Sequence, residues 1–431
     1  MLSIIIKIVK RFVPFSFYWP IKCFFMRGKI RRYRQRIPSL EKEIFSKKKI
    51  NVLFLVTDIS MWKYDGLFKL LVKDSRFIPY IIPVLNPHDS LDLQEKHQKE
   101  MKDYFLTYKS YSFVEGYDFQ KQEIFDPLKL TPDLIFYTQP YNQGYSVCRI
   151  EHLWQNALFL YTPYAFWIEK GSWGYNGLLH NIAWKLFYPT QIHLEHAQKY
   201  SWVKGVNVVV TGYPLADIFG DTRRKSKNLR KTQKKDLKKI IWAPHHSILK
   251  DDTLDYSNFL NIAEDMLNIA SKYKDYIQIA FKPHPHLKRK LYKMQGWGIE
   301  KTNQYYLKWN ELPNTILVEG DYIDLFMTSD AMIHDCSSFS VEYLYVNKPV
   351  LYLTKNNHLD FLCNFGEMAF NMHYKGSTVG DVEKFLKNVI LDGCDSMKMQ
   401  RNMFMIKYLL PSHGINVAEN MFNEVVAPWN K

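Results

Sequence analysis

Two short segments of the sequence bring together imidazole and ammonium groups that can bind phosphate. The segments are "WAPHH" (242–246) and "FKPHPH" (281–286), and their side chains of interest are His245, His246, Lys282, His284 and His286. Such groups donate strong hydrogen bonds to phosphate oxygens. One histidine beside a proline is more typical of a structural turn, but four histidines in two similar segments favour an anion site. We therefore predict that both segments contribute to one phosphate-binding site.

A third segment, "DAMIHDCSSFSVEYLYVNKPVLYL" (330–353), adds carboxylates and hydroxyls. Its candidate residues are Asp335, Ser337, Ser338 and Glu342. The apolar run before Asp335 predicts a buried strand, and the two serines stand where a helix begins. The first N–H groups of a helix have no partner within it, so they favour a bound anion. The alternative is that one of the serines only caps the helix.

Strand-like and helix-like segments alternate along the whole chain. This alternation is typical of doubly wound α/β domains with parallel sheets. Because the carboxyl ends of parallel strands meet at one edge of a sheet, we expect the three polar segments to converge. The predicted strands are 49–58, 77–86, 132–140, 156–166 and 206–214, followed by 240–246, 276–285, 315–320, 331–335 and 350–353.

These elements divide the chain into four parts. We expect a basic membrane-surface segment at 1–49, a first Rossmann-like domain at 50–220, a basic linker at 221–239, and a second Rossmann-like domain with a closing helix at 240–431. The linker has ten basic residues and few apolar ones, which predicts an exposed segment. A ligand cleft is expected between the two domains, a frequent position for such sites.

The net charge of +15 is concentrated in the N-terminal segment. Residues 1–49 hold fourteen Lys and Arg against two acidic residues, whereas the rest of the chain has a net charge of only +3. This distribution argues against a nucleic-acid-binding protein. Pro14 and Pro20 are expected to break any helix here, and no apolar run approaches about 20 residues.

The same segment mixes bulky aromatic side chains with cations, which favours binding to an anionic membrane surface. We expect a peripheral protein at the cytoplasmic face of the cell membrane. A true membrane span and an ordinary docked helix are the alternatives.

The spacing of the cysteines and the absence of several known motifs argue against disulfides and metal sites. The five cysteines are scattered and have no CxxC spacing, which argues against disulfides or a zinc site and favours a reducing compartment. The sequence has no GxxxxGK loop and no HExxH. Asp251 and Asp252 are the nearest candidates for a metal clamp and are typical of a polar loop. We therefore expect no metal and no cofactor.

Motifs in the second half, taken together, resemble those of one known family. "KPHP" is followed by D-x-SS and then by E-x-x-x-x-x-KP, and "TGYPLADIF" (211–219) and "GINVAENM" (414–421) add matches. The combination resembles the CDP-glycerol glycerophosphotransferases, which build teichoic acids and related capsule polymers. The resemblance covers residues 205–425 and implies a GT-B fold with a metal-independent donor site.

The resemblance also implies roles for the candidate residues. His284 would contact the donor phosphates, Ser337 and Ser338 would hold the diphosphate, and Glu342 or Asp321 would lie near the nucleoside. The predicted catalytic residues are His284, His245 and Glu169, and the predicted donor-binding residues are Lys282, His286, Asp321, Asp335, Ser337, Ser338 and Glu342.

The first half departs from the family pattern at the position of the base. The family usually carries a WHGTP stretch, whose histidine would deprotonate the acceptor hydroxyl. The corresponding stretch here is "LYTPYAFWIEKG" (160–171), which keeps the Thr-Pro and has no histidine. A base must reach the hydroxyl within hydrogen-bond distance. The nearby candidates are Glu169, His180 and Tyr164.

The expected function follows from this resemblance. It is the transfer of a polyol phosphate, most simply glycerol phosphate, from a CDP-activated donor to a hydroxyl of a lipid-linked or polymeric glycan acceptor, with release of CMP. Two alternatives stay open. One is a GT-B glycosyltransferase that uses a nucleotide sugar, and the other is a non-catalytic assembly partner that lacks the base.

Overall fold

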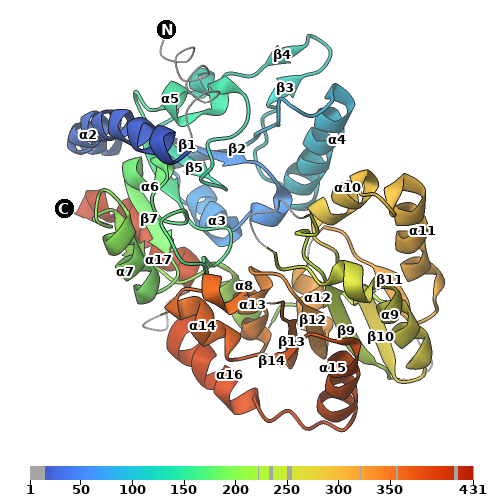
Figure 1. Ribbon diagram of the computed structural model, residues 1–431. Coiled ribbons are helices and arrows are strands. Elements are labelled where there is room, and N and C mark those ends of the chain that lie inside the picture. Colours follow the sequence, from blue (N-terminus) through green and yellow to red (C-terminus); the bar gives the residue numbers. More distant parts are fainter. Residues whose placement is uncertain are drawn as a thin grey trace. The chain divides into compact units, whose positions relative to one another are not determined.

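The computed structural model consists of two compact α/β units (Figure 1). It describes residues 15–430, with gaps at 222, 233–235, 250–254, 321, 356–357 and 412–415. Unit 1 comprises the chain up to Tyr164, Ser172–Thr211 and the chain from Ala418 onward. Unit 2 comprises Ala165–Gly171 and Gly212–Val417.

Unit 1 is built on a six-stranded parallel sheet in the order β2-β1-β5-β6-β7-β8. The strands β5 and β6 are buried along their whole length, as expected for parallel strands covered on both faces. The strands are β1 Ile50–Val56, β2 Phe77–Pro83, β5 Leu134–Tyr137, β6 Leu158–Tyr161, β7 Lys185–Tyr188 and β8 Val208–Val210, with a separate antiparallel hairpin of β3 Tyr117–Asp118 and β4 Glu123–Ile124.

Two helices of unit 1 begin at residues whose side chains cap the N-terminus. Ser90 caps α4 by accepting the N–H of Leu93, and Thr190 caps α7 by accepting the N–H of His193. The helices are α2 Phe15–Phe45, α3 Asp65–Lys73, α4 Leu91–Lys102, α5 Ile150–Leu153, α6 Leu178–Ile182, α7 Gln191–Tyr200 and α17 Val417–Val426.

Helix α2 is longer than the sequence suggested. We expected Pro20 to break a helix, but α2 runs through it from Phe15 to Phe45. Pro20 lies close to the start of the helix, where it removes the hydrogen bond to the carbonyl of Ser16 alone. Among the residues that the structure describes, no helix combines the length and the hydropathy that crossing a bilayer requires.

The second half of α2 is part of the core of unit 1. Ile30, Tyr33 and Ile44 are buried, and the hydroxyl of Tyr33 donates to the carbonyl of Ala157 at 2.7 Å. The indole N–H of Trp184 donates to Glu41 at 2.8 Å. The segment 1–49, predicted as a separate membrane-surface part, therefore contributes its second half to the adjoining α/β unit.

Unit 2 is built on a second six-stranded parallel sheet, in the order β11-β10-β9-β12-β13-β14. Alternate residues such as Trp242 and Phe281 face one core, which α9 and α11 cover with Phe259 and Trp309. The strands are β9 Lys238–Ala243, β10 Ile277–Phe281, β11 Thr315–Leu317, β12 Ala331–His334, β13 Val350–Leu353 and β14 Tyr374–Gly376.

The helices of unit 2 alternate with its strands, as the sequence predicted. They are α8 Leu215–Gly220, α9 Phe259–Lys272, α10 Pro285–Lys293, α11 Gly298–Glu311, α12 Ile323–Thr328, α13 Phe339–Glu342, α14 Asn364–Phe370, α15 Val379–Lys384 and α16 Lys398–Phe404. Short 3-10 segments follow α13 at Tyr343–Val346 and precede α14 at His358–Phe361.

The compact units differ from the predicted domain ranges in two ways. The closing helix α17 lies in unit 1 from Ala418 onward, where Lys185 pairs with Glu424 at 2.5 Å. The predicted linker 221–239 falls within unit 2. Its described residues are mostly exposed or half-buried, and the exceptions are Leu237 and Arg230, whose guanidinium donates to the hydroxyl of Thr328 at 3.3 Å.

Candidate functional site

The three polar segments begin at neighbouring points of the sheet of unit 2. The strand β9 pairs with β10 on one side and with β12 on the other. The register aligns Trp242 with Phe281, and Ala243 with His334. The residues that follow each strand therefore leave the sheet side by side, and the predicted convergence of the three segments is confirmed.

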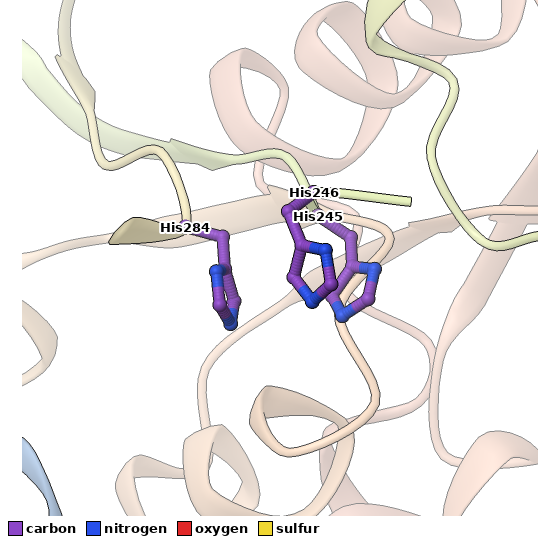
Figure 2. Close-up of side chains that lie close together, drawn as sticks. All are labelled: His245, His246 and His284. Carbon is purple, nitrogen blue, oxygen red and sulfur yellow. The ribbon is translucent and has the colours of Figure 1, made fainter. Parts of the chain in front are cut away.

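Three histidines form a compact cluster at this edge. The ring centroids of His245 and His246 are 4.2 Å apart, and the ring of His246 lies 4.2 Å from that of His284. Figure 2 shows the three rings pointing in the same direction from two neighbouring loops. The ring of His286 lies 5.3 Å from that of His284, and this fourth histidine is exposed.

Hydrogen bonds fix which ring nitrogen carries the hydrogen in two of the histidines. The Nδ1 atom of His284 accepts the backbone N–H of His286 at 3.1 Å, because His284 is the N-cap of α10. The Nδ1 atom of His245 accepts the backbone N–H of Ser247 at 3.3 Å. A backbone N–H can only donate, so in a neutral ring the hydrogen stays on Nε2. Both rings therefore present Nε2–H donors.

The environment keeps the His284 ring neutral in the absence of an anion. Burial lowers the pKa of His284 far below its ordinary value, and the neighbouring His246, His245 and His286 rings and Lys282 lower it further. Lys282 is itself buried, directly after β10. An anion bound here would accept the Nε2–H donors and pair with the charge of Lys282, so the cluster is suited to a phosphate.

The same three histidines also satisfy the distance requirement of a metal site. Ligand atoms of His245, His246 and His284 all lie within 4.8 Å of one another. A metal ion needs a free lone pair on each ligating nitrogen. In His245 and His284 the Nδ1 lone pair already accepts a backbone N–H, and Nε2 carries the hydrogen. This arrangement favours hydrogen bonding to an anion over coordination of a metal.

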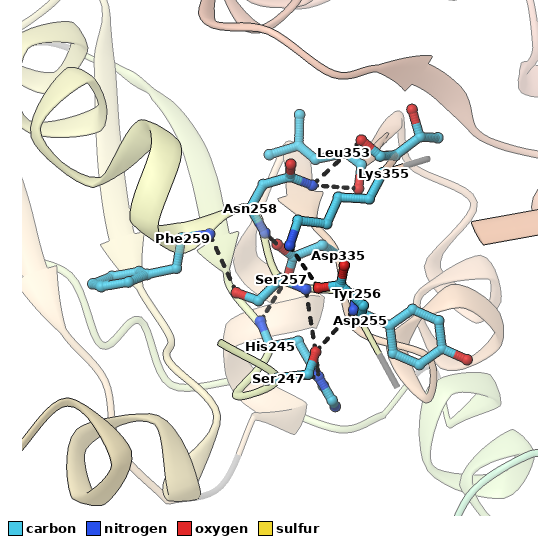
Figure 3. A network of polar contacts seen from close by, with 11 residues as sticks. His245, Ser247, Asp255, Tyr256, Ser257, Asn258, Phe259, Asp335, Leu353 and Lys355 are labelled. Atoms are coloured by element: carbon cyan, nitrogen blue, oxygen red, sulfur yellow. Dashed lines mark hydrogen bonds and ion pairs between the residues drawn. The ribbon is translucent and has the colours of Figure 1, made fainter. Parts of the chain in front are cut away.

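Asp335 is a positioning residue in this structure. We predicted a direct contact with the donor, but one carboxylate oxygen accepts the N–H of His245 at 2.5 Å and the other accepts the N–H of Asn258 at 2.7 Å. Figure 3 shows the network that results, in which Ser247 also accepts the N–H of Tyr256. Burial raises the pKa of Asp335 to about 7, and the two backbone N–H groups oppose that rise.

The serine pair precedes a helix that is shorter than predicted. The helix α13 has four residues and continues as a 3-10 turn. Ser338 occupies the N-cap position without a side-chain capping bond, so its hydroxyl does not serve as the cap of α13. Ser337 interacts with the carboxylate of Glu169. The structure therefore brings one of the two serines next to a predicted catalytic residue.

Glu169 lies in the segment Ala165–Gly171, which is part of unit 2. Its carboxylate accepts the hydroxyl of Tyr256 at 3.1 Å, and the ring of Tyr256 packs edge-on against His245 with a centroid distance of 5.4 Å. Burial raises the pKa of Glu169 above its ordinary value, and the hydroxyls of Tyr256 and Ser337 act in the opposite direction. A carboxylate with a raised pKa is a stronger base.

Glu342 is buried and is held by two tyrosines. Its Oε1 accepts the hydroxyl of Tyr213 and its Oε2 that of Tyr322, both at 2.5 Å. We predicted that Glu342 would bind the nucleoside, but in this structure both oxygens accept protein hydroxyls. Each carboxylate oxygen keeps a second lone pair, so the tyrosine contacts leave acceptor capacity for ribose hydroxyls, and the role of Glu342 near the nucleoside stays a prediction.

The remaining candidate residues lie in unit 1 or outside the described residues. His180, an alternative base, is buried and its Nδ1 accepts the N–H of Gly177 at 3.1 Å, so it caps α6 within unit 1. Tyr164 lies in unit 1 and its hydroxyl is 3.0 Å from that of Tyr141. Asp321, like Asp251 and Asp252, lies outside the described residues.

Sequence reasoning did not identify the residues that support the site. Ser247 and Tyr256 position the loop of His245, while Tyr213 and Tyr322 hold Glu342. The only available signal was that Tyr213 belongs to the Gly-Tyr-Pro motif. Ser247, Tyr256 and Tyr322 stand in segments with no distinctive spacing.

Two doubly wound α/β units with parallel six-stranded sheets define this chain as a protein of GT-B-type fold. Residues 184–378 match the family described as CDP-Glycerol:Poly(glycerophosphate) glycerophosphotransferase. The resemblance seen in the sequence, to the CDP-glycerol glycerophosphotransferases, is thereby confirmed. A search of curated proteins found no match.

Solved structures with the same fold are distant in sequence. A variant of the wall teichoic acid polymerase TagF is 14% identical with a TM-score of 0.55, over 94% of this chain and 97% of that one. MnaA of S. aureus in complex with UDP is 17% identical with a TM-score of 0.54, over 89% and 97%. The UDP-GlcNAc 2-epimerase of Neisseria meningitidis bound to UDP-GlcNAc is 15% identical with a TM-score of 0.51, over 88% and 100%.

Proposed function

We propose that this protein transfers a polyol phosphate, most simply glycerol phosphate, from a CDP-activated donor to a hydroxyl of a lipid-linked or polymeric glycan acceptor. CMP is released, and the product is a teichoic acid or capsule-type polymer. The observation that carries the proposal is the cluster of His245, His246 and His284 at the sheet edge of unit 2. This cluster lies within the segment 184–378 that matches the glycerophosphotransferase family.

The proposed reaction is a displacement at the β-phosphorus of the donor. The acceptor oxygen forms a bond with that phosphorus, and the bond from phosphorus to the oxygen that bridges to CMP breaks. The electron pair leaves with CMP, and the proton of the acceptor hydroxyl passes to a base. Because charge is spread over the phosphoryl oxygens in the transition state, positioned hydrogen-bond donors are the main source of catalysis.

The histidine cluster supplies such donors in the proposed reaction. The Nε2–H groups of His245 and His284 would donate to the diphosphate oxygens, and the ammonium group of the buried Lys282 would add a positive charge. Ser337 would donate from the third loop. Asp335 holds the His245 loop in place through backbone hydrogen bonds.

Glu169 is the base in this proposal. Its carboxylate lies next to Ser337 and accepts the hydroxyl of Tyr256, which itself packs against His245. Glu169 therefore belongs to the same side-chain cluster as the proposed phosphate ligands. Its raised pKa suits proton transfer from a hydroxyl more closely than an ordinary carboxylate would. It would replace the histidine of the family's WHGTP stretch.

The proposal places the reaction at the cytoplasmic face of the cell membrane, where a lipid-linked acceptor is accessible. The support is the composition of the N-terminal segment, in which fourteen basic residues accompany many aromatic ones.

A second candidate function is supported by the fold. Proteins of the same fold bind UDP or UDP-GlcNAc, so a GT-B glycosyltransferase with a nucleotide sugar is the main alternative. Such an enzyme would release a nucleoside diphosphate, whereas the phosphotransferase releases CMP. A non-catalytic assembly partner would release neither.

The experiment that tests the proposal is an assay of nucleotide release. The purified full chain is incubated with membrane-extracted acceptor and with CDP-glycerol, CDP-ribitol or UDP-GlcNAc in separate reactions. CMP release from a CDP-polyol supports the proposal and identifies the polyol. UDP release alone contradicts it in favour of the glycosyltransferase, and the absence of any release favours the assembly partner.

A further inference from the structure

A cavity of about 950 Å³ in unit 1 is not part of the site described above. Helix α2 forms one wall, and the end of α7 with the loop that follows it forms another. The cationic residues that line it are Arg27, Arg31, Arg34 and Lys204, and the described lining includes no Asp or Glu. A cleft lined by one sign of charge attracts ions of the opposite sign.

The arginines are presented by helical spacing. Positions 27, 31 and 34 follow one another at intervals of four and three residues, which places them on one face of α2. The buried residues Ile30 and Tyr33 lie on the face that packs on unit 1. The packing of α2 therefore fixes the direction of the arginine row and holds it over the cavity.

The cationic groups have few partners within the protein. Arg34 donates to the carbonyls of Asn181 and Ala183 at 3.3 Å, and Arg27 stacks over the ring of Trp202 at 5.0 Å. Among the described residues, none of the four cations takes part in an ion pair. Like charges at such spacing repel one another, so a bound anion would stabilise this wall of the cavity.

We propose that this cavity binds the phosphate of a lipid headgroup at the membrane surface. The guanidinium groups of Arg27 and Arg31 would hold the phosphate oxygens through paired N–H donors. This inference rests on the proposed function in one respect, namely that the protein works at a membrane. It goes further in assigning a defined phosphate site to α2 in place of a diffuse basic surface.

The sequence of α2 supports a lipid as the source of the phosphate. The residues of the helix before Arg27 include Phe15, Phe17, Tyr18, Trp19, Phe24 and Phe25. Aromatic residues of this kind favour the boundary between headgroups and acyl chains.

A pair of neighbouring arginines provides a matched test. Arg31 lines the cavity, whereas Arg32 is exposed on the same helix and does not. The variants Arg27→Gln, Arg31→Gln and Arg32→Gln each remove one positive charge. Binding of the full chain to phosphatidylglycerol-rich vesicles and to pure phosphatidylcholine vesicles is measured by flotation, with thermal melting to confirm that each variant is folded.

The expected result is a graded loss of binding. Loss of a surface charge near an anionic bilayer weakens binding about fivefold, which is the effect expected for Arg32→Gln. Loss of a bidentate phosphate contact should weaken binding by about a further tenfold for Arg31→Gln and Arg27→Gln. Equal losses in all three variants, or no loss in the cavity variants, would overturn the proposal.

Soluble glycerol phosphate separates the two sources of phosphate. If an excess of it releases the wild-type protein from vesicles, the cavity recognises the phosphate group alone. If it does not, and the Arg31 and Arg32 variants still differ, the cavity requires a phosphate within a bilayer. Vesicle binding is measured without any CDP donor. A negative result would therefore contradict the lipid-phosphate proposal and would have no bearing on the proposed transferase activity.

Discussion

The carboxylate of Asp335, at the end of β12, accepts the backbone N–H of His245, at the end of β9, at 2.5 Å. Its other oxygen accepts the N–H of Asn258, which precedes α9, at 2.7 Å. One buried side chain therefore connects two of the three loops at the sheet edge, and it holds the His245 ring in the histidine cluster.

Replacement of Asp335 by alanine should destabilise unit 2. It leaves two buried backbone N–H groups without an acceptor, and each such group costs about 1–3 kcal/mol. We expect the free energy of unfolding to fall by about 2–5 kcal/mol in chemical denaturation. The control is Asp255→Ala, which removes an exposed ion pair with Lys355 and should cost at most about 1 kcal/mol. Equal effects of the two variants would contradict the role assigned to Asp335.

Asp335 should also make stability depend on pH. Its pKa rises from 3.8 to about 7 in the folded protein, so folding favours the protonated carboxyl. The contribution of the protonated carboxyl to the free energy of unfolding is fully present below a pH of about 4 and is lost as the pH rises through about 7. The variant Asp335→Asn cannot titrate here. The difference in unfolding free energy between wild type and variant should therefore shrink over this range, by up to about 4 kcal/mol. A difference that does not change with pH would refute this assignment.

Replacement of Glu169 by glutamine should separate catalysis from donor binding. Loss of a general base lowers kcat by about a hundredfold to ten-thousandfold, while the affinity for the donor should change little. The matched control is Glu367→Gln, since Glu367 is half-exposed, lies in α14 and has only a long contact of 3.9 Å with Lys170. The measurement is CMP release at saturating donor.

The pH profile gives an independent check on Glu169. The base acts only when it is deprotonated, and burial raises its pKa above the ordinary value. Activity of the wild type should therefore fall on acidification at a pH above the usual range of a glutamate. If Glu169→Gln keeps the wild-type rate and profile, another group is the base.

The two tyrosines that hold Glu342 should contribute to the stability of unit 2. Tyr322→Phe and Tyr213→Phe each remove one short hydrogen bond to a buried carboxylate. Such a bond to a charged group contributes about 1.5–3 kcal/mol. The comparison is Tyr374→Phe, whose hydroxyl donates to Asp395 in a half-buried position. Thermal melting should show a clearly larger loss for the Glu342 partners than for Tyr374.

The sheet of unit 2 and the convergence of its three loops were predictable from the sequence. Apolar runs such as 331–335 are short and buried, and they alternate with helical periodicity, so both the strand type and its carboxyl end follow from pattern alone. The positions of His245, His284 and Ser337 at those ends needed no further information.

Other features depend on contacts between residues far apart in the sequence. Tyr213 reaches Glu342 across 129 positions, and Glu169 reaches Tyr256 across 87. No local pattern specifies such pairs, so the hydroxyl partners of Glu342 and Glu169 could not be predicted from the sequence. In α2, the packing of Ile30, Tyr33 and Ile44 on unit 1 outweighs the cost of Pro20.

The most direct test of the account is the binding of CDP-glycerol to wild type and to His284→Ala by isothermal titration calorimetry. Loss of the Nε2–H donor of His284 should weaken binding at least about tenfold, because a hydrogen bond to a charged phosphate contributes about 1.5–3 kcal/mol. The control is His88→Ala, which removes an exposed histidine of unit 1 and should leave the affinity unchanged. Equal affinity of wild type and His284→Ala for CDP-glycerol would contradict the assignment of the histidine cluster as the donor phosphate site.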